Sequence, residues 1–202
     1  IMQVLSIDLG TDMVPAIGLG AEAPEAGIMD IPPRSRKESL VNKDLILRAF
    51  IWYGLLESVA CMAGYFFLNW LHGWPGVPLA SSGIVYRAAT TMTFAATVFA
   101  QIGMVFNCRT ERTSVFKKGL FSNRMILIGI AVELTIVALW SYLPFEGVHA
   151  LFNTAPLGWR DWLFLIIIPP VMLLVEELRK LFLRHHERKK KHEDKTKGEL
   201  AG

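Results

Sequence analysis

Five apolar stretches, each about as long as a lipid bilayer is thick, constrain the fold of this 202-residue chain more than any other feature. A helix needs about 20 mostly apolar residues to cross the hydrocarbon core. Residues of hydrophobic type make up 52% of the chain, and a soluble domain of this length rarely carries so many apolar runs. We therefore predict an all-α membrane protein, a five-helix transmembrane bundle. The expected spans are residues 1–20, 45–71, 88–107, 125–142 and 159–183.

The basic residues are distributed unevenly among the connecting segments. Of the 21 Lys and Arg residues, 19 lie in residues 34–48, 109–124 and 179–197, whereas only Arg87 and Arg160 fall in the other two loops. Short loops rich in Lys and Arg lie on the cytoplasmic side of membrane proteins. We therefore predict a cytoplasmic C-terminus and an outer-side start of the first helix.

The remaining sequence adds three expectations about organisation. Residues 1–183 are expected to form one membrane domain, followed by a basic, disordered cytoplasmic tail over residues 184–202. Two cysteines do not make a disulfide framework, so Cys61 and Cys108 are expected to be free thiols. The chain starts at Ile1 rather than Met, and we expect it to be a piece of a longer protein.

Two carboxylates and a hydroxyl interrupt the first apolar stretch. Asp8, Thr11 and Asp12 have the spacing i, i+3, i+4, which places them on one face of a helix. A charge at bilayer depth costs at least ~2.5 kcal/mol, and such residues usually mark ion pathways. Gly10 and Pro15 weaken the backbone hydrogen bonding around them and free carbonyl oxygens as further ligands. The pattern predicts a cation site. Pairing of both carboxylates with Lys or Arg is the alternative, but no basic residue lies inside a span away from its ends.

Several blocks of sequence resemble one known family, in order, along nearly the whole chain. The stretch LSIDLGTDMVPAIGLGAE, followed by GIMDIPPR, is similar to the sixth transmembrane helix and following loop of P-type cation-transporting ATPases. NCRTERTSVFKKGLFSN resembles their loop between helices eight and nine, and VEELRKLFLR resembles the end of helix ten. The similarity is greatest to sodium/potassium-pump α-subunits and their prokaryotic relatives, and next to calcium pumps. It implies that the five spans are helices six to ten.

The resemblance also implies roles for the cluster in the first span. Asp8 and Asp12 correspond to carboxylates shared between two central cation sites, and Thr11 to a neighbouring oxygen ligand. Calcium pumps have Asn where this chain has Asp8, which favours the sodium/potassium or proton-coupled branch. The partner ligands of the family come from helices four and five, which lie upstream.

Two further residues correspond to cation-site residues of the family. Gln101 matches a Gln of sodium/potassium pumps, although Met104 stands where those pumps have a carboxylate. Glu133 matches a glutamate associated with their additional sodium site. The alternatives are packing for Gln101 and, for Glu133, a neutral acid hydrogen-bonded to Thr135 or a neighbouring helix. Glu57 has no such match and is expected to be a protonated core residue or a helix contact.

The function implied by the resemblance is that of the C-terminal membrane part of an ATP-driven cation pump in the cell membrane. The sequence has no DKTGT motif and no nucleotide-binding domain, so ATP and Mg²⁺ would act upstream and no catalytic residue is expected here. The transported cation would be Na⁺, K⁺, Ca²⁺ or H⁺. The expected partners are the lipid bilayer and the N-terminal helices and catalytic domains of the same pump. An accessory subunit stays open, and no nucleic acid is expected.

Two other classes of protein remain as alternatives. An intramembrane aspartyl protease needs two carboxylates that face one water from different helices, whereas Asp8 and Asp12 share one helix. A stand-alone five-helix module, such as a channel subunit or an assembly factor, is the other. A phosphorylation motif in the upstream sequence would favour the pump over both.

Overall fold

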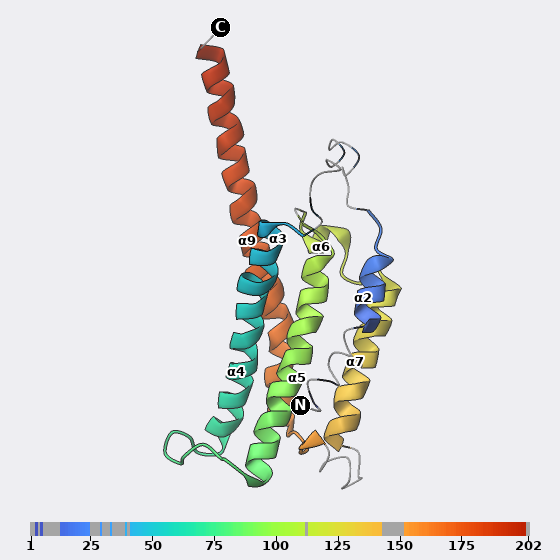
Figure 1. Cartoon of the computed structure of the whole chain (residues 1–202), viewed down its shortest axis with the longest axis vertical. Coiled ribbons are helices and arrows are strands. Elements are labelled where there is room, and N and C mark those ends of the chain that lie inside the picture. Colours follow the sequence, from blue (N-terminus) through green and yellow to red (C-terminus); the bar gives the residue numbers. More distant parts are fainter. Residues whose placement is uncertain are drawn as a thin grey trace.

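The computed structural model describes residues 13–24, 41–111, 113–142 and 152–200, together with the single residues 3, 5, 29, 33 and 39. The described chain is helical, and its long helices run side by side as a bundle (Figure 1). The elements are α2 (Met13–Gly20), α3 (Lys43–Ile46), the π-helix η3 (Leu47–Tyr53), α4 (Gly54–Leu71), α5 (Gly83–Cys108), α6 (Val115–Lys118), α7 (Arg124–Tyr142) and α9 (Trp159–Leu200).

The described helices confirm the all-α class predicted from the sequence. Three of them have the length and composition to cross a membrane: Lys43–Leu71, which joins α3, η3 and α4, then Gly83–Cys108 and Arg124–Tyr142. These correspond to the second, third and fourth expected spans. α9 contains the fifth, but acidic and basic residues lie near both ends of its apolar stretch. Half of the first expected span lies outside the described residues, and α2 is its described end.

The end of α9 differs from the expected disordered tail. The helix continues to Leu200, well past residue 183, and projects beyond the other helices in Figure 1. Lys, Arg and Glu are favourable helix formers. A helix that is already started extends easily, because the costly step is nucleation. α9 also continues through Pro169 and Pro170.

α5 is the central helix of the bundle and contacts α4, α7 and α9. Two thirds of its apolar stretch (67%) is buried, compared with 6% of the apolar stretch of Lys43–Leu71, so the described helices cover little of the latter. The alanines of α5 at positions 89, 95, 96 and 100 are fully buried. Small side chains allow close helix approach in lipid, where van der Waals packing holds helices together.

α2 packs on α7 through two glycines that leave no room for a side chain. A Cβ atom on Gly18 would lie 3.0 Å from the backbone nitrogen of Ile126, and one on Gly129 would lie 3.0 Å from the nitrogen of Pro15. The two contacts are reciprocal, because each helix contributes one glycine to the other's backbone. They fix α2 against α7 at two levels.

A buried guanidinium joins three segments at one end of the bundle. Arg109 follows α5, and its fully buried side chain uses all five of its donors. Nε and Nη2 donate to the carboxylate of Glu22, at 2.8 and 3.1 Å. Nη1 donates to the carbonyls of Gly119 and Leu120, and Nη2 also donates to Ser122 Oγ at 2.6 Å. The chain after α2, the end of α5 and the loop before α7 therefore meet at one side chain.

Asn123 completes this arrangement by capping two helices. Its Oδ1 accepts from the N–H groups of Met125 and Ile126, at 3.0 and 3.3 Å, which caps the start of α7. Its Nδ2 donates to the carbonyl of Gly18 and to Glu22 Oε2, both at 2.9 Å, so it also satisfies a carbonyl in the last turn of α2. We call Arg109, Glu22, Ser122 and Asn123 the Arg109 cluster.

A second buried group of charges ties α9 to η3. The Glu176 carboxylate has a fully buried side chain and accepts from Arg179 at 2.6 and 2.8 Å. It also accepts from Trp52 Nε1 at 3.0 Å and from Arg48 at 3.4 Å, both on η3. Because an unpaired buried carboxylate is costly, these contacts fix the distance between the two helices.

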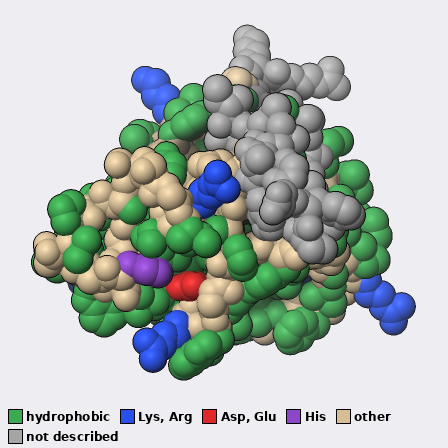
Figure 2. Space-filling view, turned by 90° about the horizontal axis from the view of Figure 1, so that it is seen from below, with side chains coloured by type: hydrophobic (Ala, Val, Ile, Leu, Met, Phe, Trp, Pro, Cys, Tyr) green, Lys and Arg blue, Asp and Glu red, His purple; other side chains and the backbone are tan. Residues whose placement is uncertain are grey.

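The opposite end of the bundle carries few charges. Among the coloured atoms in Figure 2, hydrophobic and uncharged groups dominate and basic side chains are scattered. Here the segment before α9 packs against the helix ends: the N–H of Ala155 donates to Thr91 Oγ1 at 2.9 Å, and Tyr142 donates to the carbonyl of Leu157 at 2.7 Å. The two ends of the bundle therefore differ in charge, and the orientation in the membrane stays a prediction.

The contact between α5 and α9 at Gly103 generates a test of packing. A Cβ atom on Gly103 would lie 2.8 Å from Met172 Cβ and 3.2 Å from Pro169 Cα, so we expect Gly103→Ala to destabilise the detergent-solubilised protein by about 1–3 kcal/mol. Gly54→Ala is the matched control, because its nearest atom would be the Ala49 carbonyl oxygen at 3.7 Å. A thermal unfolding midpoint that falls no further for Gly103→Ala than for Gly54→Ala would contradict this packing.

The Arg109 cluster predicts a pH-dependent stability. The hydrogen bond from Arg109 lowers the pKa of Glu22 to about 2 from an ordinary 4.5. A carboxyl whose pKa is lowered by folding stabilises the fold above its unfolded pKa and loses that contribution as the pH falls toward the folded value. Glu22→Gln should therefore unfold at a lower temperature than the wild type at pH 7. The difference should narrow as the pH falls from about 4.5 toward 2, and a difference that stays constant would contradict the prediction.

Candidate functional site

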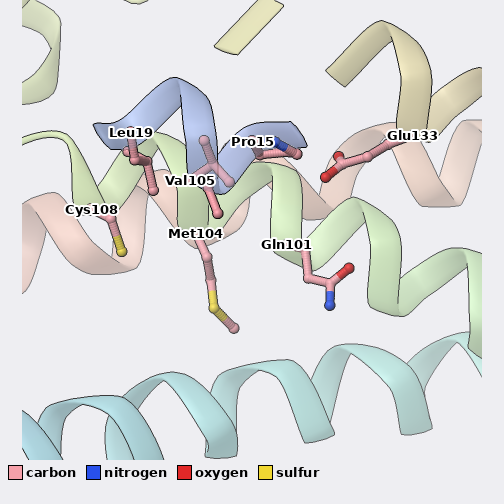
Figure 3. A pocket seen from close by; sticks show the side chains of 8 residues that line it. Pro15, Leu19, Gln101, Met104, Val105, Cys108 and Glu133 are labelled. Carbon is pink, nitrogen blue, oxygen red and sulfur yellow. The ribbon is translucent and has the colours of Figure 1, made fainter. Parts of the chain in front are cut away.

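A cavity of about 150 Å³ lies between α2, α5 and α7 and brings together two of the residues that the sequence singles out. It is lined by Pro15, Ala16 and Leu19 of α2, by Gln101, Met104, Val105 and Cys108 of α5, and by Glu133 of α7. Figure 3 shows the three helices converging on it. Most of the lining is apolar, so the polar groups of Gln101 and Glu133 stand out.

Glu133 enters this region from α7. The residue is 1% exposed, and its carboxyl group points from α7 toward Pro15 at the start of α2 (Figure 3). One helical turn earlier, Gly129 makes the close contact with Pro15 that brings the two helices together. Thr135, which the sequence offered as a hydrogen-bond partner, donates its hydroxyl to the carbonyl of Ala131 at 2.7 Å instead. Glu133 therefore faces α2, which begins directly after Asp12 in the sequence.

Gln101 contributes an amide from α5. Its Oε1 is buried and has no hydrogen-bond partner among the described residues. A buried amide oxygen without a partner is costly, and a cation or a donor from elsewhere would satisfy it. Met104, one turn further along α5, also lines the cavity, and the exposed Cys108 lines it at the C-terminal end of α5. Gln101 and Glu133 are therefore the lining residues that carry side-chain oxygen atoms.

The central residues of the predicted site, Asp8, Thr11 and Asp12, lie outside the described residues. What the structure places is the segment that follows them: α2 begins at Met13, directly after Asp12 in the sequence, and Pro15 reaches the cavity one turn later. Within the described part of the chain, no group of three His, Cys, Asp or Glu residues could hold a metal ion.

The described wall has the chemistry of part of a cation site. Hard cations such as Na⁺ and Ca²⁺ take oxygen ligands, and this wall offers one carboxylate and one amide oxygen. Hydrophobic neighbours exclude water and would strengthen the attraction between a cation and these oxygens. Glu57 lies half-buried on α4 and does not line the cavity.

Sequence reasoning missed the Arg109 cluster. Arg109 and Glu22 lie just beyond the ends of α5 and α2, where charged residues are ordinary, and the positive-inside rule counts Arg109 only as a topology signal. The available signal was Glu22, the first acidic residue after the glycine-rich end of α2, but its partner lies 87 positions away in the sequence. Cys108 at the cavity was missed for a simpler reason, because one cysteine carries no spacing pattern.

Comparison with known proteins places the whole arrangement in context. The family model of the cation transporting ATPase C-terminus matches residues 1–182. The sodium/potassium-transporting ATPase subunit alpha-2 of Gallus gallus is 34% identical over 173 residues, covering 73% of this chain and 17% of that protein. The calcium-transporting ATPase 1 of Bacillus cereus is 30% identical over 174 residues, covering 83% of this chain and 19% of that protein.

A third relative, the calcium-transporting ATPase 1 of Yarrowia lipolytica, is 30% identical over 167 residues, which is 83% of this chain and 16% of that protein. The chain thus spans less than a fifth of the length of each of these relatives. The family match ends at residue 182, so it covers the cavity and every described helix except the last part of α9. This chain therefore belongs to the P-type cation-transporting ATPases and corresponds to their C-terminal membrane region.

Proposed function

We propose that the chain supplies part of the transmembrane cation site of an ATP-driven pump in the cell membrane, with its C-terminus in the cytoplasm. The observation that carries the proposal is that Gln101 and Glu133 line one cavity together with α2, which begins directly after Asp12 in the sequence. The family match supports it independently. In the whole protein, ATP and Mg²⁺ act on catalytic domains upstream of this chain.

The chemistry of this site is the binding and release of a cation by oxygen ligands. Asp8, Thr11 and Asp12 offer two carboxylates and a hydroxyl on one helical face, and Glu133 and Gln101 add oxygens from the facing wall. Carboxylates close to one another repel unless a cation or a proton neutralises one of them. The site therefore binds cations in one state of the pump and takes up protons or a counter-ion in the other.

The same geometry gives the other helices a supporting role. α5 is the buried centre of the bundle, and α9 is packed on it at Gly103. α7 holds α2 through Gly18 and Gly129. The partners in this proposal are the lipid bilayer and the upstream helices and catalytic domains of the same pump.

The proposed cation is Na⁺, K⁺ or H⁺ in preference to Ca²⁺. The reason is Asp8, a carboxylate where calcium pumps have Asn. The names of the relatives include both sodium/potassium and calcium transporters at similar identity. Phosphorylation of the full-length protein from ATP, measured in turn with Na⁺, K⁺, Ca²⁺ and at several pH values, identifies the ion.

Neutralising Asp12 tests the central ligand. Asp12→Asn in the full-length pump should abolish cation-dependent phosphorylation and leave membrane insertion intact, because an amide cannot balance the cation charge. Asp44→Asn, at an exposed position at the start of α3, is the matched control and should behave as the wild type. Normal cation-stimulated turnover of Asp12→Asn would refute the ligand assignment.

Neutralising Glu133 tests the wall that faces α2. Glu133→Gln keeps the shape of the side chain and removes its charge, so the cation concentration for half-maximal phosphorylation should rise roughly tenfold, since ligand charge tunes cation affinity. Glu57→Gln makes the same change outside the cavity and should leave this concentration unchanged. Equal values for Glu133→Gln and the wild type would mean that Glu133 is a neutral packing residue.

A further inference from the structure

We propose that the Arg109 cluster is a positioning device for the cation site: by fixing the height and rotation of α2, it sets how tightly the pump binds its cation. The inference rests on the proposed function, because it matters only if α2 and the residues before it carry ligands. Its own evidence, however, lies entirely within the described residues.

The first part of the device is the tie between α2 and α5. Glu22 lies two residues beyond the last residue of α2, and its carboxylate receives two hydrogen bonds from the Arg109 guanidinium. A planar guanidinium that binds a carboxylate in this two-point manner fixes orientation as well as distance. The same guanidinium is held from the other side by the carbonyls of Gly119 and Leu120. Because its side chain is fully buried, a shift of Glu22 would leave donors unpaired without water to replace the carboxylate.

The second part of the device is the tie between α2 and α7. Asn123 Nδ2 reaches the Gly18 carbonyl inside α2, while Asn123 Oδ1 caps α7. Lys118 adds a third tie, since its Nζ donates to the carbonyl of Ala23 at 2.8 Å and lies 3.2 Å from Glu22 Oε1. α2 is thus held from α5, from α7 and from the loop between them.

The ties affect the cavity because α2 packs closely on α7. Gly18 is in backbone contact with Ile126, and Pro15 is in contact with Gly129, so any change in the height or rotation of α2 alters its position against α7. Pro15 and Leu19 of the same helix line the cavity beside Glu133 (Figure 3). Releasing the cytoplasmic end of α2 therefore changes the wall that faces Glu133, although the Arg109 cluster touches no bound cation.

The test is Asn123→Ser in the full-length pump. Serine is a good N-cap for α7, but it is too short to bridge to Gly18 and Glu22, so the variant removes the tie and keeps the cap. We expect the cation concentration for half-maximal phosphorylation to rise about tenfold, with the maximal phosphorylation level unchanged. Arg109→Lys, which keeps the charge and loses the two-point contact, should give a shift in the same direction.

The controls separate positioning from simple support of the fold. Glu111→Gln neutralises an exposed acid in the same loop. It should change neither the cation concentration for half-maximal phosphorylation nor the maximal phosphorylation level. A wild-type half-maximal concentration in Asn123→Ser overturns the inference, as does a fall in maximal phosphorylation with the half-maximal concentration unchanged. Should Arg109→Lys fail to fold, Asn123→Ser alone decides.

Failure of the inference is distinguishable from failure of the proposed function. Asp12→Asn is measured in the same membranes. Loss of cation dependence in Asp12→Asn together with wild-type behaviour of Asn123→Ser overturns only the positioning role. Cation dependence that survives in Asp12→Asn overturns both.

Discussion

The position of α2 in the bundle depends on one buried ion pair, between Arg109 and Glu22. A guanidinium with a fully buried side chain is tolerated only when its donors are all matched, and here a carboxylate, two carbonyls and a hydroxyl match them. Because these acceptors belong to separate segments, the requirement to satisfy one side chain brings the segments together. The hydrophobic contacts between helices can slide, but this set of hydrogen bonds has a single geometry.

The sequence predicts the broad architecture well because its physical basis is simple. Long apolar stretches specify membrane helices through length alone, and the described helices 43–71, 83–108 and 124–142 match the predictions within five residues at each end. The helical extension of α9 was not predicted, because a polar composition suggests disorder. Composition does not reveal that the packed helix upstream is already nucleated, so that the polar residues only have to extend it.

The candidate site was predictable only in part. Carboxylates and amides at membrane depth stand out in any sequence, so Gln101 and Glu133 could be singled out before their common cavity was known. The glycine contacts of Gly18 and Gly129, which set the distance between α2 and α7, carry no such signal, because a glycine in an apolar helix has several ordinary explanations. The Arg109–Glu22 pair depends on a contact between residues far apart in the sequence, which composition and periodicity do not encode.

The π-helical segment η3 has a consequence for how the second span can vary among related chains. In a π-helix each backbone hydrogen bond spans five residues, one more than in an α-helix. Arg48 and Trp52 of this segment both donate hydrogen bonds to Glu176. The wider turns lie between a short start, α3, and the long, mostly exposed α4. Removing one residue after Trp52, at the junction of η3 and α4, would rotate α4 while Arg48 and Trp52 keep their contacts with Glu176. Evolution could therefore reorient the exposed surface of α4 by a single deletion without changing these contacts.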